Sequence, residues 1–168
     1  MTTKNYKSKL SGQIGENLVV AELGRRGIIA TPFSGNVPEI DVLAYKDGKS
    51  IPIQVKSIFK GTLRTNADEY LNIEFQGNKQ IILGKNKTIN RDLIFIIIKY
   101  SELYGNDKFY ICNKGTIQDL VYDRHSQFLK KHDGERPKNP KSFDCSVYFD
   151  DLKKELDNWE LIEKEFLK

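Results

Sequence analysis

Residues 39–56 constrain the fold of this chain more than any other stretch, because they predict two strands joined by a two-residue Asp47-Gly48 turn. An Asp-Gly pair between alternating apolar residues is the strongest short-range signal for a β-hairpin. A slip of one residue would turn the apolar side chains out to water, so the register is specified. It gives one wholly apolar face, formed by the pairs Ile40–Val55, Val42–Ile53 and Ala44–Ile51.

The opposite face of this hairpin is polar, with Glu39 across from Lys56 and Asp41 across from Gln54. Directly opposed side chains on one face lie about 4.5–5.5 Å apart at Cβ. An acid, an amide oxygen and a lysine are therefore predicted to meet in one small patch. The alternative interpretation is an ordinary hairpin whose outer face is held by a Glu39–Lys56 ion pair.

Length and composition indicate a single globular domain over residues 1–168, with 39% hydrophobic and 30% charged residues. The longest apolar run, residues 93–98, is too short for a membrane span and predicts a central strand covered on both faces. Residues 1–10 are expected to form a flexible basic leader, and no apolar segment of a secretory signal follows them. The cysteines, Cys112 and Cys145, are too few for a disulfide scaffold, so we expect a cytoplasmic protein without a membrane partner.

Positive charge is concentrated before residue 150. The formal net charge is +4, and residues 150–168 contain seven acids and four bases, so that residues 1–149 carry +7. Such a balance favours a polyanionic partner such as DNA, although a solvated surface is the simpler interpretation. The basic residues that we expect to contact nucleic acid are Lys60, Arg64, Lys85, Lys87, Arg136 and Lys138.

Periodicity elsewhere predicts helices and strands in alternation. Glu16 lies on an apolar stripe of the first helix, where it is either a site residue or a rim acid bonded to a nearby base or amide. The last helix is amphipathic and either docks onto the domain or offers a surface to a protein partner. The two histidines are assigned no chemistry. Helices are expected over 11–26, 116–131 and 151–168, and strands over 28–33, 70–75, 79–83, 93–98 and 108–112.

Glu16 on a helix, Asp41 on a strand and Gln54-Val-Lys56 on the next strand resemble the PD-(D/E)XK nuclease superfamily. Many restriction endonucleases and Holliday junction resolvases belong to it, and the resemblance spans about residues 11–57. It implies an α/β, restriction endonuclease-like fold with a mixed β-sheet flanked by helices. It further implies Mg²⁺, or Mn²⁺ as a substitute, held by Asp41 and Gln54 with support from Glu16, while Lys56 positions the attacking water.

The chain departs from the family pattern in two places. Pro38 precedes Glu39 rather than Asp41, and glutamine replaces the commoner glutamate at position 54. An amide oxygen can still bind Mg²⁺, although one negative charge is lost.

The predicted function is Mg²⁺-dependent endonucleolytic cleavage of DNA. The alternatives are a non-catalytic protein of this fold that binds nucleic acid or a protein partner, and a small interaction protein with a purely structural hairpin. Many enzymes of this type act as dimers, which makes a homodimer one assembly to test.

Overall fold

The computed structural model describes residues 3–33, 37, 39–103 and 105–168, and the side chains from residue 6 onward. The chain forms two compact units, each described by itself below. The prediction of a single domain stays a prediction. No described helix is long and apolar enough to cross a membrane. Unit 1 comprises Met1–Gly61, Leu93–Cys112 and Leu152–Lys168, and unit 2 comprises Thr62–Asp92 and Asn113–Asp151.

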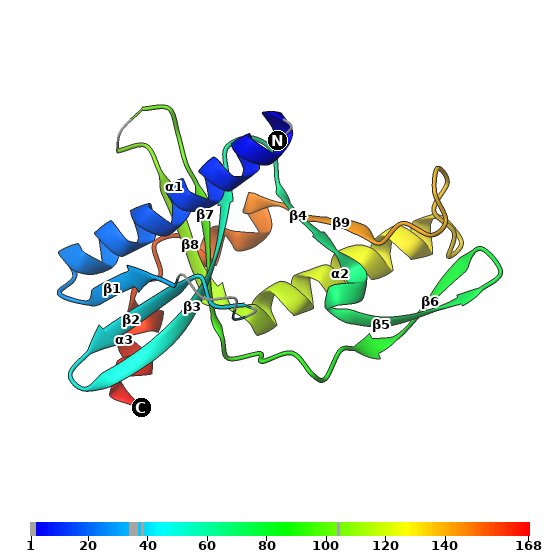
Figure 1. Cartoon of the computed structure of the whole chain (residues 1–168). Coiled ribbons are helices and arrows are strands. Elements are labelled where there is room, and N and C mark those ends of the chain that lie inside the picture. The colour runs from blue at the N-terminus through cyan, green and yellow to red at the C-terminus, as the bar shows by residue number, and fades with distance from the viewer. Residues whose placement is uncertain (1–2, 34–36, 38, 104) are drawn as a thin grey trace. The chain divides into compact units, whose positions relative to one another are not determined.

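Unit 1 contains a five-stranded mixed sheet with the order β1-β2-β3-β7-β8 (Figure 1). β1, β2 and β3 pair antiparallel, whereas β3 and β7 pair parallel. β7 lies between β3 and β8, and its first five residues are all buried, as predicted for a central strand. The strands are β1 (Ile29–Pro32), β2 (Val42–Lys46), β3 (Lys49–Ile58), β7 (Ile94–Lys99) and β8 (Lys108–Asn113). A mixed sheet in an α/β fold is thus confirmed.

The β2–β3 hairpin has the predicted register over the residues that pair. Val42 opposes Ile53, and Ala44 opposes Ile51. Both turn residues have positive φ, 50° at Asp47 and 82° at Gly48, as a two-residue hairpin loop of this kind requires.

The predicted continuation of the hairpin before Val42 is wrong. Asp41 lies in a bend, and Glu39 has a φ of 73°, so neither is part of β2. The Asp41 N–H donates to the Ile53 carbonyl (3.0 Å), while its side-chain Oδ2 accepts from the Val55 N–H (2.7 Å). A carboxylate therefore takes the place of a backbone carbonyl, and the predicted Ile40–Val55 and Glu39–Lys56 pairs are absent from the ladder.

Helix α1 (Thr3–Arg25) begins eight residues earlier than predicted, so that most of the expected leader is helical. Its buried residues Gly15, Val19 and Leu23 repeat every four positions and form the face turned to the sheet. The core of unit 1 joins α1 to alternate residues of the strands and to α3 (Glu160–Leu167).

The C-terminal segment is broken where a continuous helix was predicted. A 3-10 helix, η2 (Phe149–Glu155), is separated from α3 by Asp157, whose φ is 52° and whose N–H donates to the Phe109 carbonyl (2.7 Å). The break leaves Leu156 exposed, whereas Trp159, Ile162 and Phe166 are buried in the core of unit 1. The docking interpretation of this apolar stripe is confirmed for these three residues.

Unit 2 combines helix α2 with two small antiparallel sheets. The strands expected over 70–75 and 79–83 are confirmed and pair antiparallel, as β5 (Leu71–Gln76) and β6 (Lys79–Lys85). The other sheet was not predicted, because its strands have only four residues each and little apolar alternation. α2 (Lys114–Lys131) begins two residues earlier than the helix expected over 116–131, with Asn113 at its N-cap. The remaining elements are β4 (Leu63–Asn66), β9 (Asp144–Val147) and the 3-10 helix η1 (Ala67–Glu69).

Replacing Gly15 by alanine is expected to destabilise the protein by about 1–3 kcal/mol, because an added methyl group would overpack the α1–β3 contact. A Cβ at Gly15 would lie 2.6 Å from the Ser57 Cβ and 3.2 Å from its Oγ. Gly24 of the same helix has no such neighbour within 4 Å, so Gly24→Ala is the matched control and should stabilise by roughly 0.5–1 kcal/mol. Urea unfolding of both variants measures the difference, and equal effects would contradict this packing.

Candidate active site

Asp41 lies where the chain enters β2 and is held against β3 by its own side chain. The Val55 N–H donates to its Oδ2 at 2.7 Å. This charge-assisted bond orients the carboxylate and keeps it beside the segment of β3 that contains Gln54 and Lys56. Asp41 therefore lies beside β3 as predicted, but a hydrogen bond to its side chain, and not strand pairing, holds it there.

Glu16 brings a second carboxylate to this region from α1. It is half-buried and follows Gly15, which packs on Ser57 of β3. Burial raises the pKa of Glu16, and the negative charge of Asp41 raises it further. Within the described part of the chain Glu16 forms no hydrogen bond or ion pair through its side chain, so the interpretation as a rim acid with a bonded partner is not supported.

The placement of Glu16 depends on a junction that sequence reasoning missed. The Ser57 hydroxyl donates to the Ser11 carbonyl (2.6 Å), and the two hydroxyl groups lie 3.2 Å apart. Together with the Gly15 contact, these bonds fix the first half of α1 against β3. The available signal was the presence of small residues at positions 11, 12 and 15 on one side of the helix.

Gln54 provides an oxygen without a partner. It lies on β3 opposite Phe95 of β7, and its Oε1 is buried with no hydrogen-bond donor among the described residues. Leaving a buried acceptor unsatisfied costs about 1–3 kcal/mol. A bound cation would account for the unpaired oxygen, because hard divalent cations accept amide oxygens as ligands.

Lys56 lies two residues further along β3, and the period of two in a strand places it on the same side as Gln54. Its side chain is exposed and has no ion pair among the described residues. The alternative interpretation, in which a Glu39–Lys56 ion pair explains the polar face, is therefore wrong. Lys56 is left with three donors that can serve an anion or a water molecule.

The donors of this site suit a hard divalent cation. Glu16, Asp41 and Gln54 offer two carboxylates and one amide oxygen, and oxygen ligands are those that Mg²⁺ and Mn²⁺ prefer. The described residues contain no group of three or more His, Cys, Asp or Glu side chains arranged to hold a metal. A cation site in this region therefore depends on the amide of Gln54 and on exogenous ligands.

The pKa of Glu16 gives a test of this geometry without metal. Glu16→Gln is expected to stabilise the protein at pH 7 in EDTA, because ionising a group whose folded-state pKa is raised costs folding free energy. Below about pH 4 both folded and unfolded states are protonated, so the gain should vanish there. Urea unfolding across this pH range measures it.

Glu22 offers the matched control on the same helix. Its carboxylate pairs with Arg25 and Arg26, both within 2.8 Å. Glu22→Gln should therefore lower stability slightly at pH 7 rather than raise it. A Glu16→Gln variant no more stable than the wild type at pH 7 would contradict the burial of Glu16 and its proximity to Asp41.

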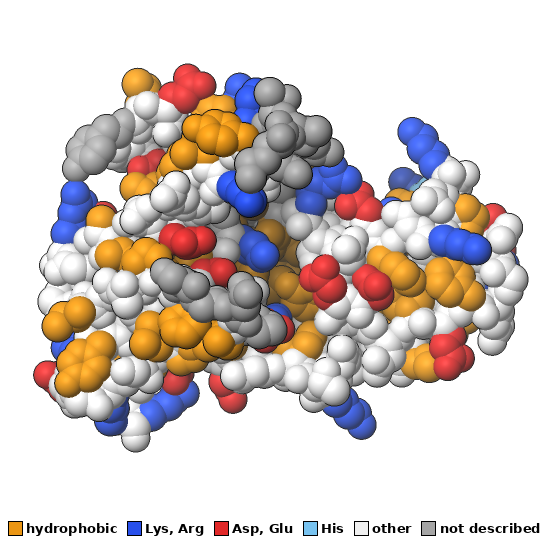
Figure 2. All heavy atoms as spheres, in the orientation of Figure 1, with side chains coloured by type: hydrophobic (Ala, Val, Ile, Leu, Met, Phe, Trp, Pro, Cys, Tyr) orange, Lys and Arg blue, Asp and Glu red, His pale blue; other side chains and the backbone are white. Residues whose placement is uncertain are grey.

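The six basic residues predicted to contact nucleic acid are divided between the two units. Lys60 belongs to unit 1, where its Nζ lies 5.0 Å from the centre of the Phe59 ring. The other five belong to unit 2, and Arg64 is bound to Asp144 (2.8 Å). Figure 2 shows basic side chains interspersed with acidic ones over the face in view. The predicted interface stays a prediction as a whole.

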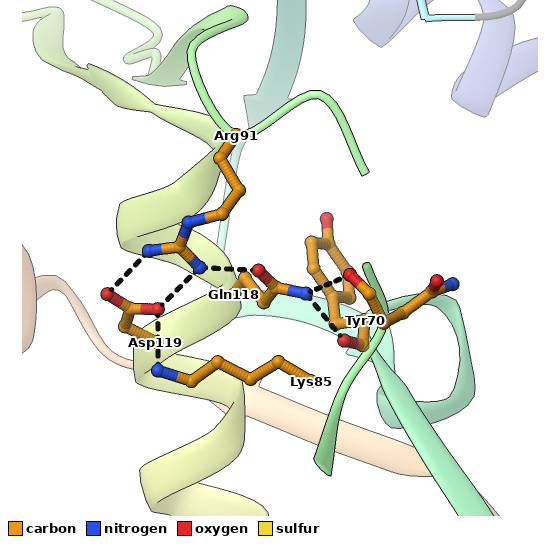
Figure 3. A network of polar contacts seen from close by, with 6 residues as sticks. Tyr70, Lys85, Arg91, Gln118 and Asp119 are labelled. Atoms are coloured by element: carbon orange, nitrogen blue, oxygen red, sulfur yellow. Dashed lines mark hydrogen bonds and ion pairs between the residues drawn. The ribbon is translucent and has the colours of Figure 1, made fainter. Parts of the chain in front are cut away.

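Lys85 is part of a polar network that fixes the loop after β6 to α2 (Figure 3). Its Nζ lies 2.9 Å from the Asp119 carboxylate, which also accepts two bonds from Arg91 (2.8 and 3.0 Å). The buried Gln118 accepts from Arg91 and donates to the Tyr70 carbonyl (2.8 Å). These bonds hold the pKa of Asp119 below its usual range. A structural role for Lys85 is therefore established by its contacts.

Comparison with known proteins gives little further information. No family model matches the sequence. No curated protein matches it either. A solved structure of a bacterial homing endonuclease superposes with a TM-score of 0.41 at 15% sequence identity, over 67% of this chain and 72% of that one. The function of this chain is therefore inferred from its own residues.

Proposed function

We propose that this protein is a Mg²⁺-dependent endonuclease that hydrolyses phosphodiester bonds in DNA. The observation that carries the proposal is the unpartnered, buried Gln54 Oε1 on a strand to which the Asp41 carboxylate is bonded, with the charge of Asp41 acting on Glu16. A divalent cation would satisfy the amide oxygen and relieve the repulsion between the carboxylates. The order of these residues, with Lys56 after Gln54, resembles that of the PD-(D/E)XK superfamily.

Each side chain has a role that its surroundings support. Asp41 would be the principal ligand, because the Val55 N–H already orients it. Gln54 would add an amide oxygen, and Glu16 would act directly or through a water. When bound, Mg²⁺ or Mn²⁺ shields the phosphate charge and makes a bound water more acidic. Lys56, with no ion pair among the described residues, would hold the attacking water and stabilise charge that develops on the phosphate.

A non-catalytic protein that binds nucleic acid is the second candidate. The observation in its favour is Gln54 itself, which leaves the set with two carboxylates rather than three. The basic residues of both units would then be the functional ones, with binding dominated by phosphate contacts.

Cleavage of supercoiled plasmid and linear DNA, in Mg²⁺, Mn²⁺ or EDTA, distinguishes the two candidates. We expect nicked and linear products with either metal and none in EDTA. If the wild type binds DNA but does not cut it, and Gln54→Glu does cut it, the second candidate is correct. If neither protein cuts or binds DNA under any condition, both are overturned.

Thermal unfolding gives a readout of metal binding that does not depend on activity. Mg²⁺ in excess is expected to raise the Tm of the wild type, because a ligand that binds only the folded state stabilises it. Asp41→Asn should abolish this rise, while Asp47→Asn, in the exposed turn of the same hairpin, should keep it. An equal rise in all three proteins would place the cation elsewhere.

A further inference from the structure

Unit 2 contains a pocket of about 350 Å³ that no part of the proposed active site uses. It is formed by α2, β9 and the segments next to them. Its lining combines basic, aromatic and buried polar groups, as sites for small planar ligands do. The side chains on which the following argument depends are His125, Phe128, Arg136, Asp144 and Tyr148.

His125 presents a buried hydrogen-bond acceptor whose identity follows from its neighbours. The Gln80 Nε2 donates to the carbonyls of Pro140 (2.6 Å) and Ser142 (3.0 Å), so the Gln80 Oε1 must be an acceptor. It lies 2.9 Å from the His125 Nε2, which therefore carries the proton. The Nδ1 of a neutral ring is then an acceptor, and it is buried without a partner among the described residues.

Arg136 presents the opposite chemistry in the same pocket. Its guanidinium lies over the Phe128 ring, 4.6 Å from the ring centre. It has no carboxylate partner in the described part of the chain. Contact with an aromatic ring restrains a guanidinium, and its planar set of N–H donors suits two acceptors on one edge of a ligand.

Two other charged groups of the pocket, Asp144 and Arg124, are already paired. Asp144 is bound to Arg64 (2.8 Å). Arg124 is bound by both oxygens of Asp151 and lies 4.8 Å from the centre of the Tyr148 ring. Tyr148 is 48% exposed and can stack on a planar ligand.

We infer that this pocket binds an unpaired guanine base. Guanine has two neighbouring acceptors, O6 and N7, which match the donors of an arginine, and it has N–H donors for the His125 Nδ1. An extruded base is commonly held by such edge contacts together with aromatic stacking. A base in a nucleic-acid strand and a free guanine nucleotide share this chemistry. The assignment of the base to a nucleic-acid strand rests on the proposed function, whereas the guanine-binding pocket itself does not.

Binding of single-stranded oligonucleotides in EDTA tests this inference without any cleavage. Three labelled strands differ at one central position, which holds guanine, adenine or an abasic site, and fluorescence anisotropy gives their affinities. We expect the guanine strand to bind at least about 10-fold more tightly than the abasic one. Arg136→Met should remove this difference. Lys138→Met, a neutralised exposed lysine two residues away, should weaken all three strands equally.

The binding results test the guanine pocket independently of DNA cleavage. Equal affinity for the three strands would show phosphate contacts only and would overturn the inference, as would a guanine preference that survives Arg136→Met. No binding of any strand or of guanosine monophosphate would also overturn it. Tight binding of guanosine monophosphate alone, lost in Arg136→Met, would support the pocket and assign it to a free nucleotide. A protein that fails to cut DNA can still give each of these results.

Discussion

Asp41→Asn is expected to reduce Mg²⁺-dependent DNA cleavage by at least about 1,000-fold, a loss of roughly 4 kcal/mol of transition-state stabilisation. Asparagine keeps a carbonyl oxygen that can accept from the Val55 N–H, so the entry into β2 should survive. What is lost is the charge of the ligand that the structure orients best. Cleavage rates under single-turnover conditions, with saturating metal, measure the effect.

The control for this variant is Asp47→Asn in the turn of the same hairpin. Asp47 has a φ of 50°, a conformation that asparagine adopts readily, and it is exposed. Its replacement should change cleavage by less than about twofold. Equal losses in the two variants would mean that the hairpin matters for stability alone, and unchanged cleavage in Asp41→Asn would refute the site assignment.

The hairpin shows how much of the site the sequence can predict. The Asp-Gly turn and the apolar pairs specify the register of β2 and β3. A shift of one residue would turn out to water the apolar side chains that the two-residue turn places opposite one another. The period of two along β3 then places Gln54 and Lys56 on one side of that strand. What the pattern could not predict is that the Asp41 side chain replaces a backbone acceptor, since an aspartate within a strand and an aspartate that ends it have the same sequence spacing.

Elements that depend on distant partners were harder to predict. β4 pairs with β9, about 80 residues away, and each strand is only four residues long. The stripe of Leu156, Trp159 and Phe166 fitted one helix by spacing, but the positive φ of Asp157 divides it. Residue types alone do not show that the Phe109 carbonyl takes the Asp157 N–H. Tertiary contacts overrode local preference in both places.

Acidification is expected to destabilise unit 2 through His125, by about 3 kcal/mol between pH 7 and pH 4. Burial lowers the pKa of His125 to about 4, and the positive charge of Arg136 lowers it further. The unfolded chain takes up a proton below about pH 6.5, while the folded state resists it, so stability is full above that pH. It declines as the pH falls towards 4, where the folded state also becomes protonated and the loss levels off.

His125→Gln isolates this contribution, because glutamine can still donate to the Gln80 Oε1 but does not titrate. The urea midpoint of the wild type should fall more steeply with pH than that of the variant. His132→Gln, which removes the imidazole whose ring lies 4.5 Å from that of Phe128, is the control for loss of a histidine that does not contact Gln80. Coincident slopes for the wild type and His125→Gln would mean that the folded state takes up a proton on this imidazole as readily as the unfolded chain does, and would contradict the expected effect of its burial.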